Sequence, residues 1–396
     1  MKSILYVFDD INYTSGAQKV MLYQIKTLMN QYSISVFSLT KPHHDIVLYL
    51  NGVEFLDPNV WEKNIFINLS LRDVLKDRGI KKRVKLQRIT YSVANYLSLN
   101  NLITKMLISA DIVRKFSEFN TIVITSEGSR LRSFISTLQE PKKIQWIHTD
   151  YLAWSNFSNW TKNITSNDDK IYRSYDKIIA LTMTSKKGLL KKIPILEDKV
   201  EVIHNLIQIE EIEKKSMEPC NLKMESGFVN IITIGRLDIE KGYDRVIDLC
   251  KKCKSNKFMF KWYIIGDGPL REHLEQRIKE DELDDVLILL GKVDNPYPIL
   301  KQADYFVLFS EYEGTPVTIY ESLILKIPVI ATDVGGIREQ LENGKYGILV
   351  ENDFENIYFE LTKILEIGIK VNIINNFTEI AQVHNKNIIK QLKELI

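Results

Sequence analysis

Short apolar runs alternate with amphipathic stretches along almost all of the 396-residue sequence. The apolar runs are typical of buried strands, whereas the stretches between them follow a helical period of 3.6 residues. In 17–29, for example, Val20, Ile25 and Leu28 recur on one helical face. Because strands that alternate with helices predict a parallel sheet covered on both faces, the expected fold class is α/β.

The alternation occurs in two blocks. In the first block the expected strands are 4–9, 34–39, 53–56, 121–126, 143–148, 177–182 and 200–204, with a long helical region at 87–118. In the second block they are 229–234, 262–265, 286–290, 305–309, 328–332 and 347–350. Between the blocks, 206–226 is rich in Glu and Lys, holds Pro219 and gives no strong strand signal.

This pattern predicts two domains of about 200 residues each, a size that one hydrophobic core can serve. We expect an N-terminal domain at 1–205, a linker at 206–226, a C-terminal domain at 227–376 and a final helix at 377–396 that could cross back to the N-terminal domain. Both domains are expected to be doubly wound and Rossmann-like and to face a central cleft. Ligands of such sheets bind beyond the carboxyl ends of the strands, so the loops after the strands are where chemistry is expected.

Cysteine content and the N-terminus bear on the compartment. Three cysteines cannot all pair, and Cys250 and Cys253 form a C-x-x-C without a second pair or a histidine cluster. Two ordinary helix residues are therefore favoured over a metal or redox pair, and a reducing compartment is expected. The apolar run 4–8 is too short for a signal peptide, and no run reaches the roughly 18 apolar residues of a membrane span. A cytoplasmic protein, soluble or peripheral on the inner face of the membrane, is expected.

The net charge of +2 conceals an asymmetry, because Lys and Arg exceed Asp and Glu by 29 to 19 in 1–205 and fall short by 24 to 32 in the remainder. Much of the excess lies in the segment Lys76–Arg88, which carries Lys76, Arg78, Lys81, Lys82, Arg83, Lys85 and Arg88. The segment could attract an anionic membrane, at about 1 kcal/mol per nearby charge, or form a solvated helix face. Nucleic acid is not expected as a partner, because the segment belongs to no nucleic-acid-binding module.

The loop after the first strand of the second block suits a diphosphate. Gly235 follows the strand directly, and a glycine there lets the backbone approach a ligand closely. Arg236 and Lys241 supply cations, and Gly242 opens a helix whose N-terminus also favours anions. Each feature alone is also compatible with an ordinary surface turn.

Two later loops add weaker signals. Gly266-Asp267-Gly268 follows a strand but lacks the third glycine of a dinucleotide fingerprint. In the loop after 305–309, Gly314 and Pro316 shape a turn before a helix, so free amides there can receive phosphate or sugar oxygens. Glu313 precedes this helix and Glu321 lies about two turns along it, on roughly the same side.

Together these residues closely resemble the family 4 retaining glycosyltransferases of the GT-B fold, the group 1 glycosyl transferases. The resemblance spans most of the chain and is strongest over 228–352. It is carried by Gly235-Arg236-Leu237 with Lys241-Gly242, by Gly266 to Leu270, by Glu313 and Glu321 with seven residues between them, and by Thr332-Asp333-Val334-Gly335-Gly336-Ile337-Arg338-Glu339.

The resemblance implies a role for each matching residue. Arg236 and Lys241 would neutralise the donor diphosphate, Glu313 would contact the donor sugar, and Glu321 would hold the ribose hydroxyls. The loop residues Gly235 and Gly266 would lie in the donor site, and Lys292-Val293 would contact the base. The amides of Gly314, Thr315, Pro316 and Val317 would meet the sugar and phosphate, proline contributing only its position in the turn. The family needs no metal and no cofactor other than the nucleotide-sugar.

The first block matches the family less well. Gly16 resembles a residue of the family's glycine-rich first loop, but Ser15 replaces a second glycine and Gln18 replaces a glutamate. His148 resembles a histidine that contacts the donor sugar, and the alternative is a strand-end histidine held by a structural bond. Tyr151, Trp154 and Trp160 could cradle an acceptor or be buried.

The expected function is a metal-independent, retaining hexosyl transfer from a nucleotide-sugar, UDP-linked in preference to GDP-linked, to a glycan or lipid-linked acceptor in cell-envelope polysaccharide synthesis such as that of capsule or lipopolysaccharide. The alternatives are a GT-B nucleotide-sugar epimerase, a non-catalytic GT-B partner subunit and an enzyme acting on small soluble sugars.

Overall fold

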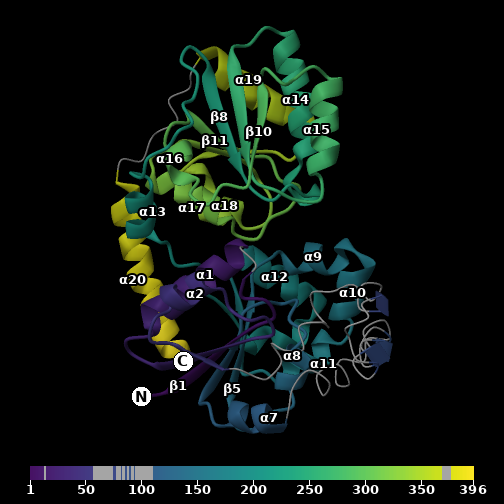
Figure 1. Cartoon of the computed structure of the whole chain (residues 1–396), viewed down its shortest axis with the longest axis vertical. Helices are drawn as coiled ribbons and strands as arrows, with labels where there is room; N and C mark the ends of the chain where they lie inside the picture. The colour runs from purple at the N-terminus through teal and green to yellow at the C-terminus, as the bar shows by residue number, and fades with distance from the viewer. Residues whose placement is uncertain are drawn as a thin grey trace. The chain divides into compact units, whose positions relative to one another are not determined.

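The computed structural model describes residues 1–12, 15–56, 75–76, 82, 85–86, 89–90, 93, 110–367 and 376–396. The chain divides into two compact units (Figure 1). Met1–Leu181, Lys186–His204 and Ile396 form the first unit, and Thr182–Ser185 with Asn205–Leu395 form the second. Most of the long helical region predicted at 87–118, and most of the basic segment Lys76–Arg88, lies outside the described residues.

The first unit is built on a seven-stranded parallel sheet in the order β3-β2-β1-β4-β5-β6-β7. Its strands are β1 (Ser3–Phe8), β2 (Ser33–Ser38), β3 (Glu54–Leu56), β4 (Thr121–Ile124), β5 (Lys142–Ile147), β6 (Lys177–Ala180) and β7 (Val200–Val202). Its helices are α1 (Gly16–Leu28), α2 (His44–Tyr49), α7 (Ala110–Ser117), α8 (Arg132–Ile135), α9 (Tyr151–Phe157), α10 (Asn159–Thr165), α11 (Asp168–Arg173) and α12 (Met183–Lys192), the first residues of α12 grouping with the second unit.

Strand β1 shows why this sheet is covered on both faces. Its last five residues are all buried, as expected for a central parallel strand. Leu5 and Val7 pack in one apolar core with Ile122 of β4, whereas Tyr6 faces the other way and its hydroxyl accepts a hydrogen bond of 2.9 Å from Gln24 of α1. The period-2 alternation of the strand thus feeds two layers of helices.

The second unit holds a six-stranded parallel sheet in the order β10-β9-β8-β11-β12-β13. Its strands are β8 (Val229–Ile234), β9 (Phe260–Ile265), β10 (Leu287–Gly291), β11 (Tyr305–Leu308), β12 (Val329–Thr332) and β13 (Ile348–Val350). Its helices are α13 (Ile209–Lys215), α14 (Tyr243–Ser255), α15 (Arg271–Glu280), α16 (Tyr297–Leu300), α17 (Val317–Ile324), α18 (Ile337–Gln340), α19 (Phe354–Ile367) and α20 (Phe377–Leu395).

Neighbouring residues of β8 enter different cores of this unit. Ile231 packs with Val246 of α14 in one core, and Ile232 packs with Ile319 of α17 in the other. Accordingly α14 and α15 flank one side of the sheet in Figure 1, and α16 and α17 the other. The two sheets and their helices confirm the predicted α/β class with two Rossmann-like units.

The segment 206–226, predicted as a linker, carries helix α13 and contributes Ile207, Ile209 and Ile212 to a core of the second unit. The final helix α20 also packs in that unit through Phe377 and Ala381. Only Ile396 groups with the first unit, where its backbone oxygen accepts a hydrogen bond from Lys2.

The three cysteines are free, and they differ in exposure. Cys250 and Cys253 lie in α14 with no exposed surface, and burial raises the pKa of both thiols. Since the thiolate is the reactive form, we expect only the partly exposed Cys220 to react with DTNB in the native protein, and all three thiols after unfolding in guanidinium chloride. Release of more than one equivalent of thionitrobenzoate before unfolding would contradict this expectation.

Candidate active site

The strand order of the second unit places two loops side by side. β8 lies between β9 and β11, so the chain runs outward from β8 in one direction through β9 and β10 and in the other through β11, β12 and β13. The strand order therefore reverses direction between β8 and β11. Open α/β sheets bind their ligands beyond the carboxyl ends of the strands at such a point, where the loops after β8 and β11 lie. These loops carry the residues 235–242 and 309–316.

Backbone contacts join the two loops. Glu311 donates its amide to the carbonyl of Glu240 at 2.8 Å. Gly242 has a positive φ of 66°, and a Cβ at this position would lie 2.4 Å from the carbonyl oxygen of Phe309. Only glycine combines this conformation with such a close approach, so Gly242 holds Lys241 against the neighbouring loop.

Lys241 and Glu313 meet across the junction. The Lys241 ammonium lies 2.5 Å from the Glu313 carboxylate, and their side chains are only 16% and 9% exposed. The hydroxyl of Ser310 donates to the same Glu313 oxygen at 2.7 Å, and Thr332 fixes Ser310 by donating to its carbonyl at 2.7 Å. The sequence analysis did not predict that Lys241 and Glu313 contact each other, and it assigned no role to Ser310.

The motif 332–339, which follows β12, packs against the backbone of Glu313 and Gly314. Gly335 has a φ of 55°, and a Cβ there would lie 1.8 Å from the carbonyl oxygen of Glu313. Gly336 donates its amide to the carbonyl of Gly314 at 3.0 Å. The two glycines of this motif therefore let the loop after β12 pack directly under the Glu313 turn.

Arg236 projects differently from Lys241. Its side chain is half exposed and lies 3.4 Å from the carboxylate of Asp238. Burial raises the pKa of the nearby Glu240, and Asp238 adds to this effect, while Lys241 and Arg236 oppose it. The loop that follows β9 supports the loop that follows β8, because the amide of Leu237 donates to the carbonyl of Asp267 at 3.1 Å.

The remaining glycines close the strand ends. Gly235 donates to the carbonyl of Ile265 at 3.0 Å, and Gly266 donates to the carbonyl of Gly291 at 2.9 Å. Of the predicted base contacts next to Gly291, Lys292 is exposed and Val293 is partly buried against the apolar core.

Helix α17 presents its N-terminus beside Glu313. Gly314 and Thr315 lead into Pro316, which occupies the N-cap position before Val317. The first amides of a helix have no partner within it, so this end can receive anions. The hydroxyl oxygen of Thr315 is buried and has no hydrogen-bond partner among the described residues.

Glu321 lies further along α17 and is 6% exposed. Tyr297, at the start of α16, donates its hydroxyl to the Glu321 carboxylate at 3.0 Å. Sequence reasoning did not single out Tyr297, because nothing in the pattern links α16 to α17.

Gly16 and His148 belong to the first unit. Gly16 is the first residue of α1, and Ser15 caps that helix. The Ser15 hydroxyl accepts the amide of Gln18, and the Gln18 side chain accepts the amide of Ser15 in return. The two departures from the family pattern are thus the two partners of a capping box.

His148 follows β5 and is 9% exposed. Neither of its ring nitrogens has a hydrogen-bond partner within the described part of the chain. Burial lowers its pKa, while Glu127 and the backbone of Thr125 act in the opposite direction. Of the aromatic residues that follow, Tyr151 is buried and Trp160 is 57% exposed.

Within the described ranges the chain offers neither a membrane-spanning helix nor a metal-binding cluster. None of their helices combines the length and the apolar composition that crossing a membrane requires. These ranges also contain no group of three or more His, Cys, Asp and Glu side chains arranged to bind a metal ion.

Comparison with solved structures defines the class of fold. Anabaena Alr3699/HepE in complex with UDP-glucose superposes with a TM-score of 0.71 over 100% of both chains, at 16% sequence identity. The chain therefore has the two-domain GT-B fold. Its residues 222–380 match the model of the glycosyl transferases group 1.

Two curated relatives show the same relationship in sequence. An N-acetylgalactosamine-N,N'-diacetylbacillosaminyl-diphospho-undecaprenol 4-alpha-N-acetylgalactosaminyltransferase of Campylobacter jejuni is 31% identical over 49% of this chain and 52% of its own length. A putative colanic acid biosynthesis glycosyltransferase, WcaL of Salmonella typhimurium, is 29% identical over 46% of this chain and 45% of its own. The chain thus matches about half the length of each of these relatives.

Proposed function

We propose that this protein is a metal-independent, retaining glycosyltransferase that moves a hexose from a UDP-sugar to a glycan or lipid-linked acceptor in cell-envelope polysaccharide synthesis. The observation that carries the proposal is the Lys241–Glu313 pair, set beside the N-terminus of α17 at the topological switch point. The family of residues 222–380 and the names of the relatives support it.

Each predicted residue takes a place in this proposal. Arg236 and Lys241 neutralise the diphosphate together with the α17 N-terminus, where Gly314 to Val317 form the turn. Glu313 accepts hydrogen bonds from the donor sugar, and Glu321, oriented by Tyr297, holds the ribose hydroxyls. Lys292 and Val293 lie at the base, and Gly235 and Gly266 shape the floor. Gly16 and His148 contribute from the first unit.

The Lys241–Glu313 contact prepares the site for a dianionic ligand. In the free protein the two charges compensate each other in a partly desolvated environment, where Coulomb interactions are stronger than in water. A bound diphosphate competes for the ammonium, and the sugar hydroxyls then donate to the carboxylate. Donor binding therefore exchanges one ion pair for two sets of ligand contacts.

The reaction needs stabilisation of the departing diphosphate and of positive charge on the sugar. The bond between the anomeric carbon and the diphosphate oxygen breaks while the acceptor oxygen bonds that carbon on the same face. The acceptor proton passes to the departing diphosphate oxygen. Glu313 positions the sugar and is not the nucleophile. The α linkage in the name of the Campylobacter relative is what retention gives from an α-linked donor.

Our preference for UDP over GDP rests on the HepE complex with UDP-glucose. The basic segment Lys76–Arg88 and the lipid-linked substrate named for the Campylobacter relative support a cytoplasmic, peripheral location on the membrane. If liposomes with anionic lipid do not sediment the protein at low salt, the membrane part of the proposal is lost.

A thermal-shift screen tests the donor. At 100 times its dissociation constant a ligand adds about 2.7 kcal/mol, and a unit of this size gains about 2–4 °C per kcal/mol. We expect a rise of several degrees with UDP-sugars and a smaller one with GDP- and ADP-sugars. No shift with any of them would contradict a donor site.

Activity assays then separate the alternatives. Transfer in the presence of EDTA, with the product anomer assigned by NMR, is expected to show retention without a metal. An epimer formed without acceptor would indicate an epimerase. Donor binding with neither transfer nor hydrolysis would indicate a non-catalytic partner subunit.

A further inference from the structure

One carboxylate of the first unit connects the loops that follow the neighbouring strands β4 and β5. Glu127 follows β4 and is only 3% exposed. Its Oε2 atom accepts the amide of His148 at 3.3 Å, and its Oε1 atom accepts the amide and the hydroxyl of Thr149 at 3.1 and 2.5 Å. A single side chain thus fixes two consecutive peptide groups at the point where β5 ends.

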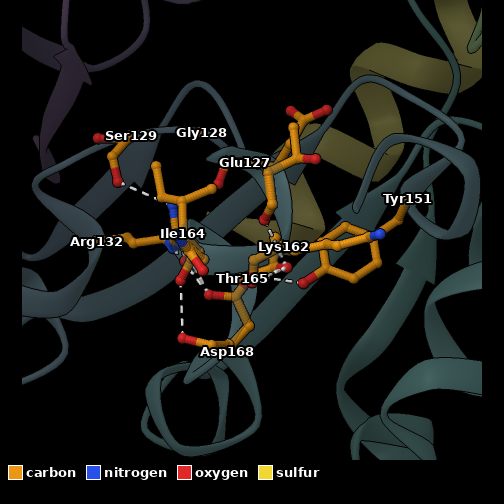
Figure 2. Close-up of polar contacts among 12 residues, drawn as sticks. Glu127, Gly128, Ser129, Arg132, Tyr151, Lys162, Ile164, Thr165 and Asp168 are labelled. Atoms are coloured by element: carbon orange, nitrogen blue, oxygen red, sulfur yellow. Dashed lines mark hydrogen bonds and ion pairs between the residues drawn. The ribbon is translucent and has the colours of Figure 1, made fainter. Parts of the chain in front are cut away.

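The turn that carries Glu127 is itself held by a buried arginine (Figure 2). Arg132 is 2% exposed, and its Nη1 atom donates to the carbonyls of Glu127 at 2.8 Å and Ser129 at 3.2 Å. Its Nε and Nη2 atoms contact Asp168 at 3.0 and 2.9 Å, and Nη2 also donates to the carbonyl of Ile164. These contacts engage all five N–H groups of the guanidinium.

Asp168 connects this network to the segment that follows β5, through Tyr151. It has no exposed surface, and the hydroxyl of Tyr151 donates to its Oδ2 atom at 2.5 Å. Tyr151 begins α9, three residues after His148. The segment between these two residues is therefore anchored at one end by Glu127 and at the other by Asp168, as Figure 2 shows for the Tyr151 end.

His148 stands in contrast to its surroundings. Its backbone is fixed by Glu127, whereas its two ring nitrogens have no partner in the described residues. A buried imidazole without partners loses the hydrogen bonds that water gives it. Buried polar side chains usually have at least one hydrogen-bond partner. The network fixes the main chain of His148, and neither of its buried ring nitrogens takes part in it.

We infer that Glu127 is a positioning residue that places His148 for the donor sugar, and that the Arg132–Asp168 pair holds Glu127 in place. The inference rests on the proposed function, which gives His148 its contact with the sugar. Nothing in the sequence pattern links Glu127 or Arg132 to His148.

Glu127→Gln is the sharpest kinetic test. The amide keeps the shape and still offers one acceptor to Thr149, but it turns an N–H₂ donor toward the amide of His148. We expect kcat to fall on the order of 10- to 100-fold, as for other small displacements of a reacting group, with the KM of the donor little changed. Glu140→Gln, which changes an exposed carboxyl of the same unit, should leave kcat unchanged.

A double-mutant cycle shows whether Glu127 acts through His148. If it does, adding Glu127→Gln to His148→Ala should change kcat by no more than about twofold, because the partner is already gone. Losses that simply multiply in the double variant would overturn the inference. If His148→Ala alone has no effect on transfer, the role of His148 in the proposed function fails, and with it the inferred purpose of Glu127.

Histidine ring NMR gives an answer that does not depend on turnover. The chain has six histidines, and the signal lost in His148→Ala identifies His148. Glu127→Gln should shift that signal and Glu140→Gln should not; an unmoved signal overturns the inference even in a protein without measurable transfer. If Glu127→Gln does not fold, Thr149→Val, which removes the hydroxyl that donates to Glu127, should cause a smaller change of the same signal.

Discussion

Replacing Lys241 with methionine is expected to lower kcat/KM for the nucleotide-sugar by on the order of 10²- to 10³-fold, the range seen when one preorganised charge-stabilising donor is removed. Lys241 is the half of the Lys241–Glu313 pair that faces a developing diphosphate charge in the proposed reaction. Without it, the buried carboxylate of Glu313 would also repel the anionic donor. Steady-state kinetics with the donor found in the thermal-shift screen measures the loss.

A second replacement separates repulsion from catalysis. In Lys241→Met/Glu313→Gln the unpaired carboxylate is removed, so donor binding should recover relative to Lys241→Met while kcat stays low. Glu313→Gln alone should also lose activity, because the sugar hydroxyls then lose an anionic acceptor. If its turnover stays within about threefold of the parent, Glu313 has no part in the chemistry.

Lys251 provides the matched control for these variants. It lies on the neighbouring helix α14, its side chain is 61% exposed, and it pairs with Asp281 at the surface. Surface pairs contribute little, so Lys251→Met should change neither kcat/KM nor stability appreciably. An equal loss of activity in Lys251→Met and Lys241→Met would show that the effect is not specific to the site.

The fold could be predicted from the sequence because its signals are local. Each strand of the two sheets is a short apolar run, and the predicted and observed bounds differ by at most two residues, as in 262–265 against Phe260–Ile265 of β9. The glycines were also legible, since Gly242 and Gly335 adopt the positive φ that favours glycine over other residues.

The partners within the candidate site were not predictable in the same way. Lys241 and Glu313 are 72 residues apart, and the Tyr297–Glu321 bond joins the ends of two different helices. Such pairs depend on which loops the strand order brings together. Polar residues in loops follow no periodicity from which that order could be predicted. Ser310 was missed for the same reason.

The buried ion pair of the first unit was equally invisible. Arg132 and Asp168 occur in stretches that read as ordinary amphipathic helices, where charged residues normally face water. In the structure the two side chains are 2% and 0% exposed, and the residues around them supply every remaining hydrogen bond of the guanidinium. Breaking such a buried pair leaves an uncompensated charge in the interior, which is strongly destabilising.

Arg132→Met is therefore expected to destabilise the first unit by about 3–5 kcal/mol, because it leaves the Asp168 carboxylate buried without its counter-charge. The change also removes both carbonyl contacts of the 127–129 turn. Urea unfolding followed by tryptophan fluorescence reports on this unit, since four of the five tryptophans precede residue 205. The transition of Arg132→Met should shift to clearly lower urea.

Two further variants decide whether the buried charge is the cause. Arg173→Met removes an exposed arginine of α11, the helix that carries Asp168, and should stay within about 0.5 kcal/mol of the parent. Arg132→Met/Asp168→Asn removes both charges and keeps an acceptor for the Tyr151 hydroxyl, so it should regain part of the lost stability. If the double variant is as unstable as Arg132→Met, packing and the carbonyl contacts, and not the unpaired charge, account for the loss.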